Sequence, residues 1–364
     1  MSTLGPANQE ILMRARADLR LGVPVILGGR ENDVIIAPVE VLSQSRLDQL
    51  KLIDKNAVIL ITARRAKTLK CPIYDDNFVR IELDKSHEIN SIKAIADPSL
   101  DLKNPLKGPF SVRRGNPLKL ENEAILLLKS AQLLPAAIIS QINDGKDYAS
   151  IHNLTYLKTD QLLAVAISPR GISNAISAEV PTERAGSSQF HIFRPSISGE
   201  EHYAIEIGKI DRDQPTLVRI HSACFTGDVL GSLKCDCGPQ LHAATHMIND
   251  HGGGLLIYLN QEGRGIGLAN KMRAYSLQDQ GFDTVEANHR LGFEDDERDF
   301  QLGAAILKEM RIDSIKLITN NPSKISTMNN YDINVIERIP LKVGQNKTNL
   351  RYLETKARKS GHLM

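Results

Sequence analysis

The sequence predicts a two-domain protein of mixed α/β and α+β class, and two observations carry this prediction. Its 364 residues are more than twice the roughly 150 residues of a typical domain. In the second half, strand-like runs alternate with helix-like runs, which is the pattern of a sheet layered between helices. We therefore expect an N-terminal α+β domain over residues 1–174 and a C-terminal three-layer α/β/α domain with a mixed sheet over residues 175–364.

The first half contains both kinds of element. A helix is predicted for EILMRARADLRLG, because its apolar residues have helical spacing and Gly22 can end it. PVILGG and DVIIAPVEVL are predicted strands that flank a turn at Gly28 and Gly29. AVILITA has the composition of a buried strand. ENEAILLLKSAQLLPAAIISQI is predicted to be a helix broken at Pro135 and followed by a strand. DKSHEINSIKAIADPSLDLKNPLKGPFSVRRGN is weakly periodic, so we expect it to be rich in loops.

The second half begins after a stretch rich in Gly and Ser, GISNAISAEVPTERAGSSQF, near which we place the domain boundary. Strands are predicted for HYAIEIGKI, TLVRIHSA, LLIYLNQ and SIKLITNN. Helices are predicted for PQLHAATHMINDHG, LANKMRAYSLQDQG and FQLGAAILKEM.

Composition excludes several classes of function. A formal net charge of +2 gives no electrostatic reason to expect a nucleic-acid partner. No apolar run reaches the roughly 20 residues of a membrane-spanning helix, so no membrane partner is expected. The first residues lack the apolar segment of a secretory signal, which predicts a cytoplasmic location. Thiols stay reduced there, which favours a metal site or catalysis over a disulfide.

Three of the four cysteines lie in one short stretch, CFTGDVLGSLKCDC. Cys224, Cys235 and Cys237 could supply three thiolate ligands, and three protein ligands with an open position are typical of catalytic zinc. An open zinc site lowers the pKa of its bound water to about 7. His242 is the nearest candidate for a fourth ligand but falls on a predicted helix. The alternative is a set of buried free cysteines, which is what we expect of Cys71.

A glycine-rich turn, NQEGRGIGLANK, follows one predicted strand and opens a helix. Gly263, Gly265 and Gly267 allow a ligand to approach the backbone closely, and the N–H groups of a helix N-terminus suit a phosphate. Arg264 adds a forked donor for an anion. The alternative is a tight turn with helix-packing glycines, since the spacing matches neither common nucleotide-binding motif.

The stretch TVEANHRLGFEDDERDF carries a run of acids with one arginine among them. Its plainer interpretation is a solvated helix start, because acids stabilise helix N-termini. Its functional interpretation is a carboxylate base beside an arginine.

Several long motifs occur in an order that resembles one family. They are HSACFTGDVLGSLKCDCGPQL, NQEGRGIGLANKMRAYSLQDQGFDTVEANHRLGF, DERDF, LITNNPSK and the tail TKARKSGHLM, and they resemble GTP cyclohydrolase II, the entry enzyme of riboflavin synthesis, over residues 177–364. The resemblance implies one zinc ion held by Cys224, Cys235 and Cys237, with GTP as substrate. It implies hydrolysis at C8 of the guanine ring, release of formate and, with Mg²⁺, of pyrophosphate. It also implies a homodimer.

The resemblance carries roles over by position. Tyr275 matches a residue that helps ring opening, Asp296 matches the proton acceptor, and Arg298 matches a residue proposed to attack the α-phosphate. We expect Arg298 instead to stabilise phosphoryl charge, because a guanidinium stays protonated. Matches to GTP contacts are Arg219, Ile220, His221, Ser222, Ala223, Gln240, Glu262, Gly263, Arg264, Thr284, Thr319 and Lys324. Two positions depart from the family pattern: Ala223 replaces Glu, and Lys234 replaces Arg.

The first half resembles a degenerate 3,4-dihydroxy-2-butanone-4-phosphate synthase, through ARADLRLGVPVIL and GRENDVIIAPVEV. Its acidic loop keeps only Arg30, Glu31 and Asp33, and LKLENEA stands where that family has Gly-His-Thr-Glu. A site short of its ligands should bind Mg²⁺ poorly, so we expect no turnover of ribulose 5-phosphate.

Three alternatives remain. The chain could be a bifunctional enzyme that also makes 3,4-dihydroxy-2-butanone 4-phosphate, or a non-catalytic regulator that binds zinc and GTP. A zinc nucleobase deaminase is disfavoured, because its His-x-Glu and Pro-Cys-x-x-Cys signature is absent.

Overall fold

A computed structural model describes residues 4–115, 120–160, 171–195, 199–350, 352–353 and 358. The chain forms two compact units. The first comprises Met1–Ser168 and Ala269–Asp295, and the second comprises Pro169–Leu268 and Asp296–Met364. The segment 269–295 thus packs with the first unit, although we expected its helix in the second domain. The ranges 1–174 and 175–364 stay predictions as sequence domains.

The first unit is built on a six-stranded sheet in the order β4-β3-β5-β2-β1-β6. Its strands are β1 (Val25–Gly28), β2 (Asp33–Pro38), β3 (Val58–Thr62), β4 (Phe78–Glu82), β5 (Ala136–Ile142) and β6 (Tyr156–Lys158). Only the β1–β6 pair is parallel. The strands are rich in Ile, Val and Leu, which suit a pleated surface with buried faces. The strands predicted from the sequence around Gly28, in AVILITA and after Pro135 are confirmed.

Helices complete this unit. They are α1 (Asn8–Arg20), α2 (Gln44–Ile53), α3 (Ala63–Thr68), α4 (Ile89–Ala96), α5 (Leu120–Ser130), α6 (Gly145–His152), α10 (Leu268–Asp279) and α11 (Thr284–Leu291), with short 3₁₀ turns at Val39–Val41 and Pro98–Leu100. Gly22 follows α1 with φ of 75°, as expected of a residue that ends a helix. The stretch 84–116 was expected to be rich in loops, and most of its described residues lie outside helices and strands. It also contains α4, a helix that was not predicted and in which four of the eight residues are buried.

Cys71 lies in the core of the first unit, as expected. It is 7% exposed, and burial raises the pKa of its thiol to about 11 despite the nearby charge of Arg65. A thiol that stays protonated is a poor nucleophile and a poor metal ligand.

The segment 269–295 is held to the rest of its unit by polar contacts across long stretches of chain. Arg273 donates from Nε to Oδ2 of Asp97 and from Nη2 to Oε1 of Glu40, both at 3.0 Å. The Asn270 side chain donates to the carbonyl oxygen of Gln132 at 2.9 Å. These contacts explain why α10 packs in the first unit, and no local sequence pattern could have shown it.

The second unit is built on a seven-stranded sheet in the order β13-β12-β10-β11-β9-β8-β7. Its strands are β7 (Ile172–Thr182), β8 (Gly186–Pro195), β9 (His202–Gly208), β10 (Thr216–Ser222), β11 (Gly253–Leu259), β12 (Ser314–Ile318) and β13 (Asn334–Ile339). The four strands from β13 to β11 are parallel to one another, whereas β9, β8 and β7 join in antiparallel pairs. The predicted mixed sheet is confirmed.

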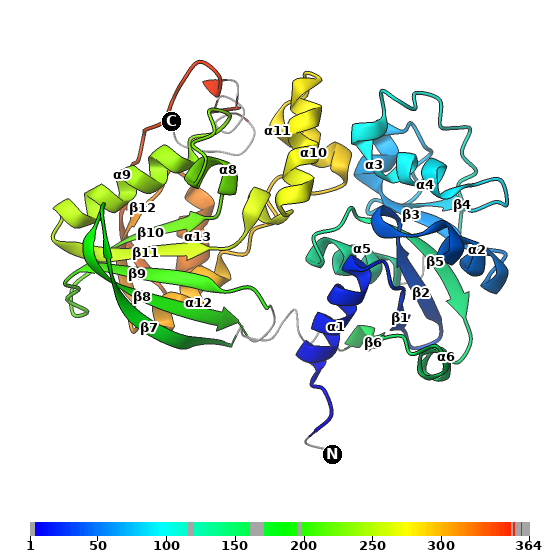
Figure 1. Cartoon of the computed structure of the whole chain (residues 1–364), viewed down its shortest axis with the longest axis horizontal. Helices are drawn as coiled ribbons and strands as arrows, with labels where there is room; N and C mark the ends of the chain where they lie inside the picture. The colour runs from blue at the N-terminus through cyan, green and yellow to red at the C-terminus, as the bar shows by residue number, and fades with distance from the viewer. Residues whose placement is uncertain are drawn as a thin grey trace. The chain divides into compact units, whose positions relative to one another are not determined.

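Helices cover both faces of this sheet (Figure 1). Helix α9 (Cys237–Asp250) packs on one face, where Ala244 and Ile248 join Leu217 and Leu256 in one apolar cluster. Helices α12 (Gln301–Glu309) and α13 (Pro322–Asn330) pack on the other face, against strand residues that include Ile220. This arrangement confirms the predicted three layers. Among the described residues, no helix is both long and apolar enough to cross a membrane.

The sheet also determines where the motifs identified in the sequence meet. Strands β10, β11 and β12 are parallel, so their carboxyl ends lie at the same edge. Loops that follow such strand ends commonly form ligand sites. Cys224 follows β10, Glu262 follows β11 and Thr319 follows β12.

Candidate active site

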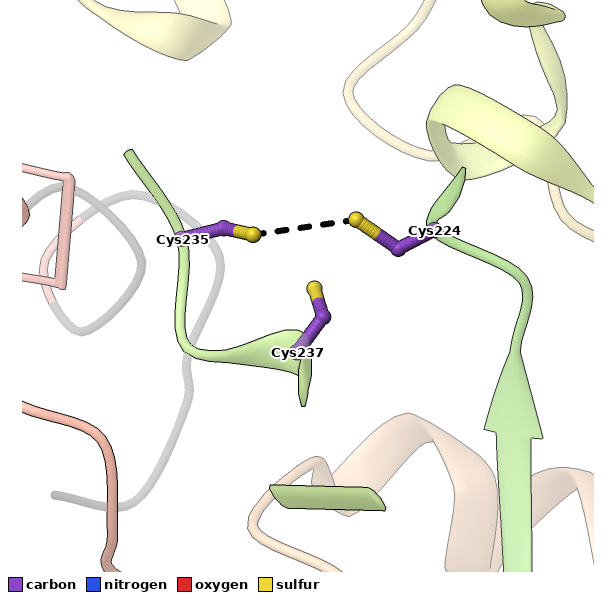
Figure 2. Close-up of side chains that lie close together, drawn as sticks. All are labelled: Cys224, Cys235 and Cys237. Atoms are coloured by element: carbon purple, nitrogen blue, oxygen red, sulfur yellow. Dashed lines mark hydrogen bonds between the residues drawn. The ribbon is translucent and has the colours of Figure 1, made fainter. Parts of the chain in front are cut away.

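Three cysteine sulfurs gather at this edge of the second unit (Figure 2). Cys224 follows β10, Cys235 lies in the next loop and Cys237 is the first residue of α9. Their Sγ atoms all lie within 4.8 Å of one another, and the Cys224 and Cys235 sulfurs are 3.7 Å apart. Disulfide sulfurs would lie about 2.05 Å apart, so this pair is not bonded.

This spacing fits a zinc ion. Two sulfurs that each lie about 2.3 Å from one tetrahedral ion are about 3.8 Å apart, close to the separation of the Cys224 and Cys235 sulfurs. Gly227 leaves the necessary room, because a Cβ atom there would come within 2.8 Å of the Cys235 sulfur and 3.0 Å of the Cys224 sulfur. Among the described residues, the fold brings Cys224, Cys235 and Cys237 together as a group of three potential metal ligands.

A short 3₁₀ turn, η3 (Glu262–Gly265), follows β11 as the glycine pattern predicted. Gly263 and Arg264 both adopt left-handed backbone angles, with φ of 62° and 60°. Gly265 has φ of 92°, and a Cβ atom there would meet the Glu297 carbonyl oxygen at 2.6 Å. The glycine therefore allows the turn to pack against the loop that carries Asp296 and Arg298. Glu262 ties the turn to the cysteine loop, because its Oε2 accepts from the Phe225 amide at 2.6 Å.

Arg219 and Gln240 form a buried chain of hydrogen bonds beside the cysteines. Arg219 donates to Oε1 of Gln240 at 2.7 Å and to the carbonyl oxygen of Ile318 at 3.1 Å, and Gln240 donates to Asp236 at 2.5 Å. Burial lowers the pKa of Arg219 to about 10. The arginine stays charged at neutral pH and links β10 to the residue between Cys235 and Cys237.

Arg298 and Asp296 form a bidentate ion pair in the loop before α12. Nε and Nη2 of Arg298 donate to the two Asp296 carboxylate oxygens at 2.8 and 2.5 Å, and Nη1 lies 3.4 Å from the Ser222 hydroxyl. Burial favours the neutral form of both groups, but their pairing outweighs it. The pKa of Asp296 is therefore lowered and the pKa of Arg298 is raised.

Lys324 on α13 lies near Phe300, which follows this loop. Its Nζ donates to the carbonyl oxygen of Ile220 at 2.7 Å and lies 5.0 Å from the centre of the Phe300 ring. The Arg298 guanidinium lies 4.8 Å from the same ring centre. Two positive groups thus lie close to one aromatic ring. Thr319 is buried and accepts from the Asn321 amide at 3.0 Å.

Two predicted site residues belong to the first unit. Tyr275 lies on α10, where the Lys271 ammonium is 5.7 Å from its ring centre. Thr284 begins α11 and accepts from the Gln278 side chain at 3.2 Å. The cysteines and the other predicted site residues belong to the second unit.

Ala223 and His221 complete the predicted set. The Ala223 amide donates to the carbonyl oxygen of Leu259 at 2.8 Å, so its main chain is part of the β10–β11 connection. His221 is 3% exposed, and its ring stacks on Tyr258 with 5.5 Å between ring centres. Gly227, Asp228 and Tyr258 were not predicted as site residues, although an acid four residues after Cys224 was a visible signal.

Three cysteine sulfurs at the carboxyl edge of a mixed sheet are consistent with a zinc site. Residues 173–340 match the family model for GTP cyclohydrolase II. GTP cyclohydrolase-2 of Azospirillum brasilense is 37% identical over 357 residues, which covers 96% of this chain and 93% of the relative. GTP cyclohydrolase-2 of Neisseria meningitidis serogroup B is 54% identical over 193 residues, which covers 53% of this chain and 97% of the relative.

The chain belongs to the GTP cyclohydrolase II family of enzymes. Riboflavin biosynthesis protein RibBA of Cytophaga hutchinsonii is 39% identical over 304 residues, covering 77% of this chain and 73% of the relative. That alignment extends well into the first half, which confirms the resemblance of this half to 3,4-dihydroxy-2-butanone-4-phosphate synthase. A solved structure of RibBX, a two-domain 3,4-dihydroxy-2-butanone 4-phosphate synthase from A. baumannii, has a TM-score of 0.34 at 16% identity, over 93% of this chain and 100% of that one.

Proposed function

We propose that this chain catalyses the zinc-dependent hydrolysis of GTP to 2,5-diamino-6-(5-phosphoribosylamino)pyrimidin-4-one, formate and pyrophosphate, the first step of riboflavin biosynthesis. The observation that carries this proposal is the convergence of the three cysteine sulfurs within 4.8 Å of one another. Family membership supplies the substrate. A homodimer and a cytoplasmic location are part of the same proposal.

Cys224, Cys235 and Cys237 would hold the zinc ion. When bound, zinc would supply Lewis-acid activation of water for attack on the guanine ring. The protein's own part is to fix the three sulfurs. Gly227 leaves space beside them, and the Arg219–Gln240–Asp236 chain holds the backbone between Cys235 and Cys237.

The triphosphate would lie near the glycine turn, with Mg²⁺ bound to it. Gly263 and Arg264 bring main-chain groups and a guanidinium to the edge of the sheet that carries the cysteines. Further GTP contacts are proposed for Arg219, Ile220, His221, Ser222, Ala223, Gln240, Glu262, Thr284, Thr319 and Lys324. Several of these side chains, such as Lys324, also bond the main chain, so they would shape the site as well as bind substrate.

Arg298 would stabilise charge on the phosphates, and Asp296 would accept a proton. The ion pair raises the pKa of Arg298, so its guanidinium stays protonated and lacks the lone pair that a nucleophile needs. Tyr275 would assist opening of the ring. These roles follow from the family pattern and from the pairing geometry.

The bifunctional alternative is disfavoured by the first unit. Oδ2 of Asp33 accepts from the Gly145 amide at 2.8 Å, so it serves the fold of the acidic loop. Within the described ranges, the acids of this unit do not form a group of three potential metal ligands. Residues 118 and 119 of LKLENEA lie outside the described residues. We propose that this half does not turn over ribulose 5-phosphate.

The experiment is incubation of the purified protein with GTP, Mg²⁺ and zinc while formate, pyrophosphate and the pyrimidine product are followed. The proposal predicts all three products. Binding of GTP by a zinc-loaded protein without any turnover would contradict it and would favour the regulator. A parallel incubation with ribulose 5-phosphate should give no product, and a product there would establish the bifunctional alternative.

A further inference from the structure

The buried carboxylate of Asp228 lies within hydrogen-bond distance of three groups near the cysteine loop. Its Oδ2 accepts from the main-chain amide of Cys224 at 2.9 Å and from the Tyr258 hydroxyl at 2.9 Å. His221 Nε2 lies 3.1 Å from both carboxylate oxygens. The side chain of Asp228 is 3% exposed, and Asp228 is not among the residues to which the family pattern assigns a role.

The donors come from two different parts of the fold. His221 and Tyr258 are paired residues on the neighbouring parallel strands β10 and β11, and their rings stack. Cys224 and Asp228 begin and end the short turn around helix α8 (Phe225–Asp228). The carboxylate therefore fastens the turn that carries a cysteine to two central strands of the sheet.

Burial gives the direction of the hydrogen bonds. Burial lowers the pKa of His221, which keeps its imidazole neutral. The proton then lies on Nε2, where it can be donated to the carboxylate. A buried carboxylate is costly unless it is well hydrogen-bonded, and here each of its three partners is a donor.

The position of Cys224 depends on this anchor. The turn between Cys224 and Asp228 lies close to two of the sulfurs, since a Cβ atom on Gly227 would lie 2.8 Å from the Cys235 sulfur and 3.0 Å from the Cys224 sulfur. A small shift of this turn would therefore change the distance between the Cys224 sulfur and the other two. Partners that orient metal ligands typically contribute about 10- to 100-fold to metal affinity or activity.

We propose that Asp228 is the positioning residue of the zinc centre. It holds the amide of Cys224 and, through Tyr258 and His221, fixes the position of the cysteine loop relative to strands β10 and β11. This inference rests on the proposed function, because it requires that the three cysteines bind zinc. It predicts that Asp228 controls metal affinity without contacting the metal.

The test is zinc affinity by competition with a chromophoric chelator, together with the absorption spectrum of the cobalt(II)-loaded protein. Asp228→Asn replaces one acceptor oxygen by an NH₂ group that faces donors, so zinc affinity should fall about 10- to 100-fold and the cobalt–thiolate bands should shift. Tyr258→Phe removes one donor and keeps the carboxylate, so it should shift both readouts in the same direction but less. Asp228→Glu should restore part of the affinity.

Asp54→Asn is the matched control. Asp54 also accepts two main-chain amides, those of Asn56 at 2.7 Å and Gln141 at 2.9 Å, but it lies in the first unit. The Asp54→Asn variant should have the same zinc affinity and cobalt spectrum as the parent protein. If Asp228→Asn does not fold, Tyr258→Phe decides the question.

The outcomes separate the two proposals. A parent protein that binds no zinc would contradict the proposed function itself. If the parent binds zinc, and if Tyr258→Phe and folded Asp228→Asn have the zinc affinity and cobalt bands of the parent, the role of Asp228 is overturned. Weakened zinc binding and altered bands in these variants, but not in Asp54→Asn, would support it.

Discussion

The guanidinium of Arg298 and the carboxylate of Asp296 face each other through two parallel hydrogen bonds, from Nε at 2.8 Å and from Nη2 at 2.5 Å. Two residues apart in the chain, they form one charge-paired unit beside Ser222 at the end of β10. Such a fork binds an anionic oxygen in the same way, so a phosphate could compete with Asp296 for it.

Replacement of Arg298 by alanine should therefore slow pyrophosphate release from GTP by about 100- to 1000-fold, the usual effect of removing a donor that stabilises developing charge. The reason is the loss of the guanidinium from the phosphates. The measurement is pyrophosphate release under saturating GTP. Arg194→Ala is the control, because Arg194 forms a comparable pair with Glu201 at an exposed site. Pyrophosphate release at the parent rate would remove Arg298 from the mechanism.

A second prediction concerns how Arg298 acts. Because pairing with Asp296 raises the pKa of Arg298, no covalent guanylyl–arginine adduct should form. Acid-quenched turnover mixtures, digested and examined by mass spectrometry, should show an unmodified peptide around residue 298. A guanylyl mass on that peptide would show instead that Arg298 is a nucleophile.

The contacts of Arg273 predict how the segment 269–295 is attached to the first unit. Arg273→Ala should lower the free energy of unfolding by about 1 to 3 kcal/mol, because Glu40 and Asp97 lose a shared charged donor. Hydrogen exchange within 269–295 should increase more than elsewhere in the unit. Arg113→Ala, which removes a bond to the Asn56 carbonyl oxygen and a weak pair with Glu82, should leave exchange in 269–295 unchanged. Equal exchange in parent and Arg273→Ala would show that these ion pairs do not hold the segment.

His202 gives a prediction for pH dependence. It is 1% exposed, and burial lowers its pKa to about 4, whereas an unfolded histidine titrates near about 6.5. The unfolded chain therefore binds a proton first as the pH falls. The stability that neutral His202 contributes is complete above about pH 6.5 and is lost progressively toward about pH 4, by about 2 kcal/mol at about pH 5.

The measurement is urea unfolding at about pH 7.5 and about pH 5, compared with His202→Asn. The Asn side chain can still accept from the Asn260 amide, as Nδ1 of His202 does at 3.0 Å, but it does not titrate. The loss of stability at low pH should be smaller in the variant by about 2 kcal/mol. His251→Asn changes an exposed histidine and should behave as the parent does. If His202→Asn and the parent lose the same free energy of unfolding between the two pH values, His202 is not the source of that loss.

The cysteine cluster and most of the second unit were predictable because their signals are local. The spacing of Cys224, Cys235 and Cys237 pointed to a metal site. Strand β11 contains the apolar run LLIYL, and β10 is buried along most of its length. Strands β7 and β8 were missed because the Gly and Ser content of the stretch 171–190 favoured a domain boundary, and because nine of the eleven β7 residues are exposed, unlike those of a buried strand. The packing of α10 on the first unit was also unpredictable, since Arg273 meets Glu40 across 233 positions of sequence.

The zinc centre is tested most directly by formate release from GTP in the parent protein and in Cys235→Ser, with bound zinc measured in the same samples. The parent should contain zinc and release formate together with pyrophosphate. Cys235→Ser removes one of the three sulfurs, so the variant should lose zinc. Formate release should slow by more than about 100-fold, which exceeds the usual effect of changing a residue that only orients a metal ligand. Formate release at the parent rate by Cys235→Ser would contradict a catalytic zinc held by these three cysteines.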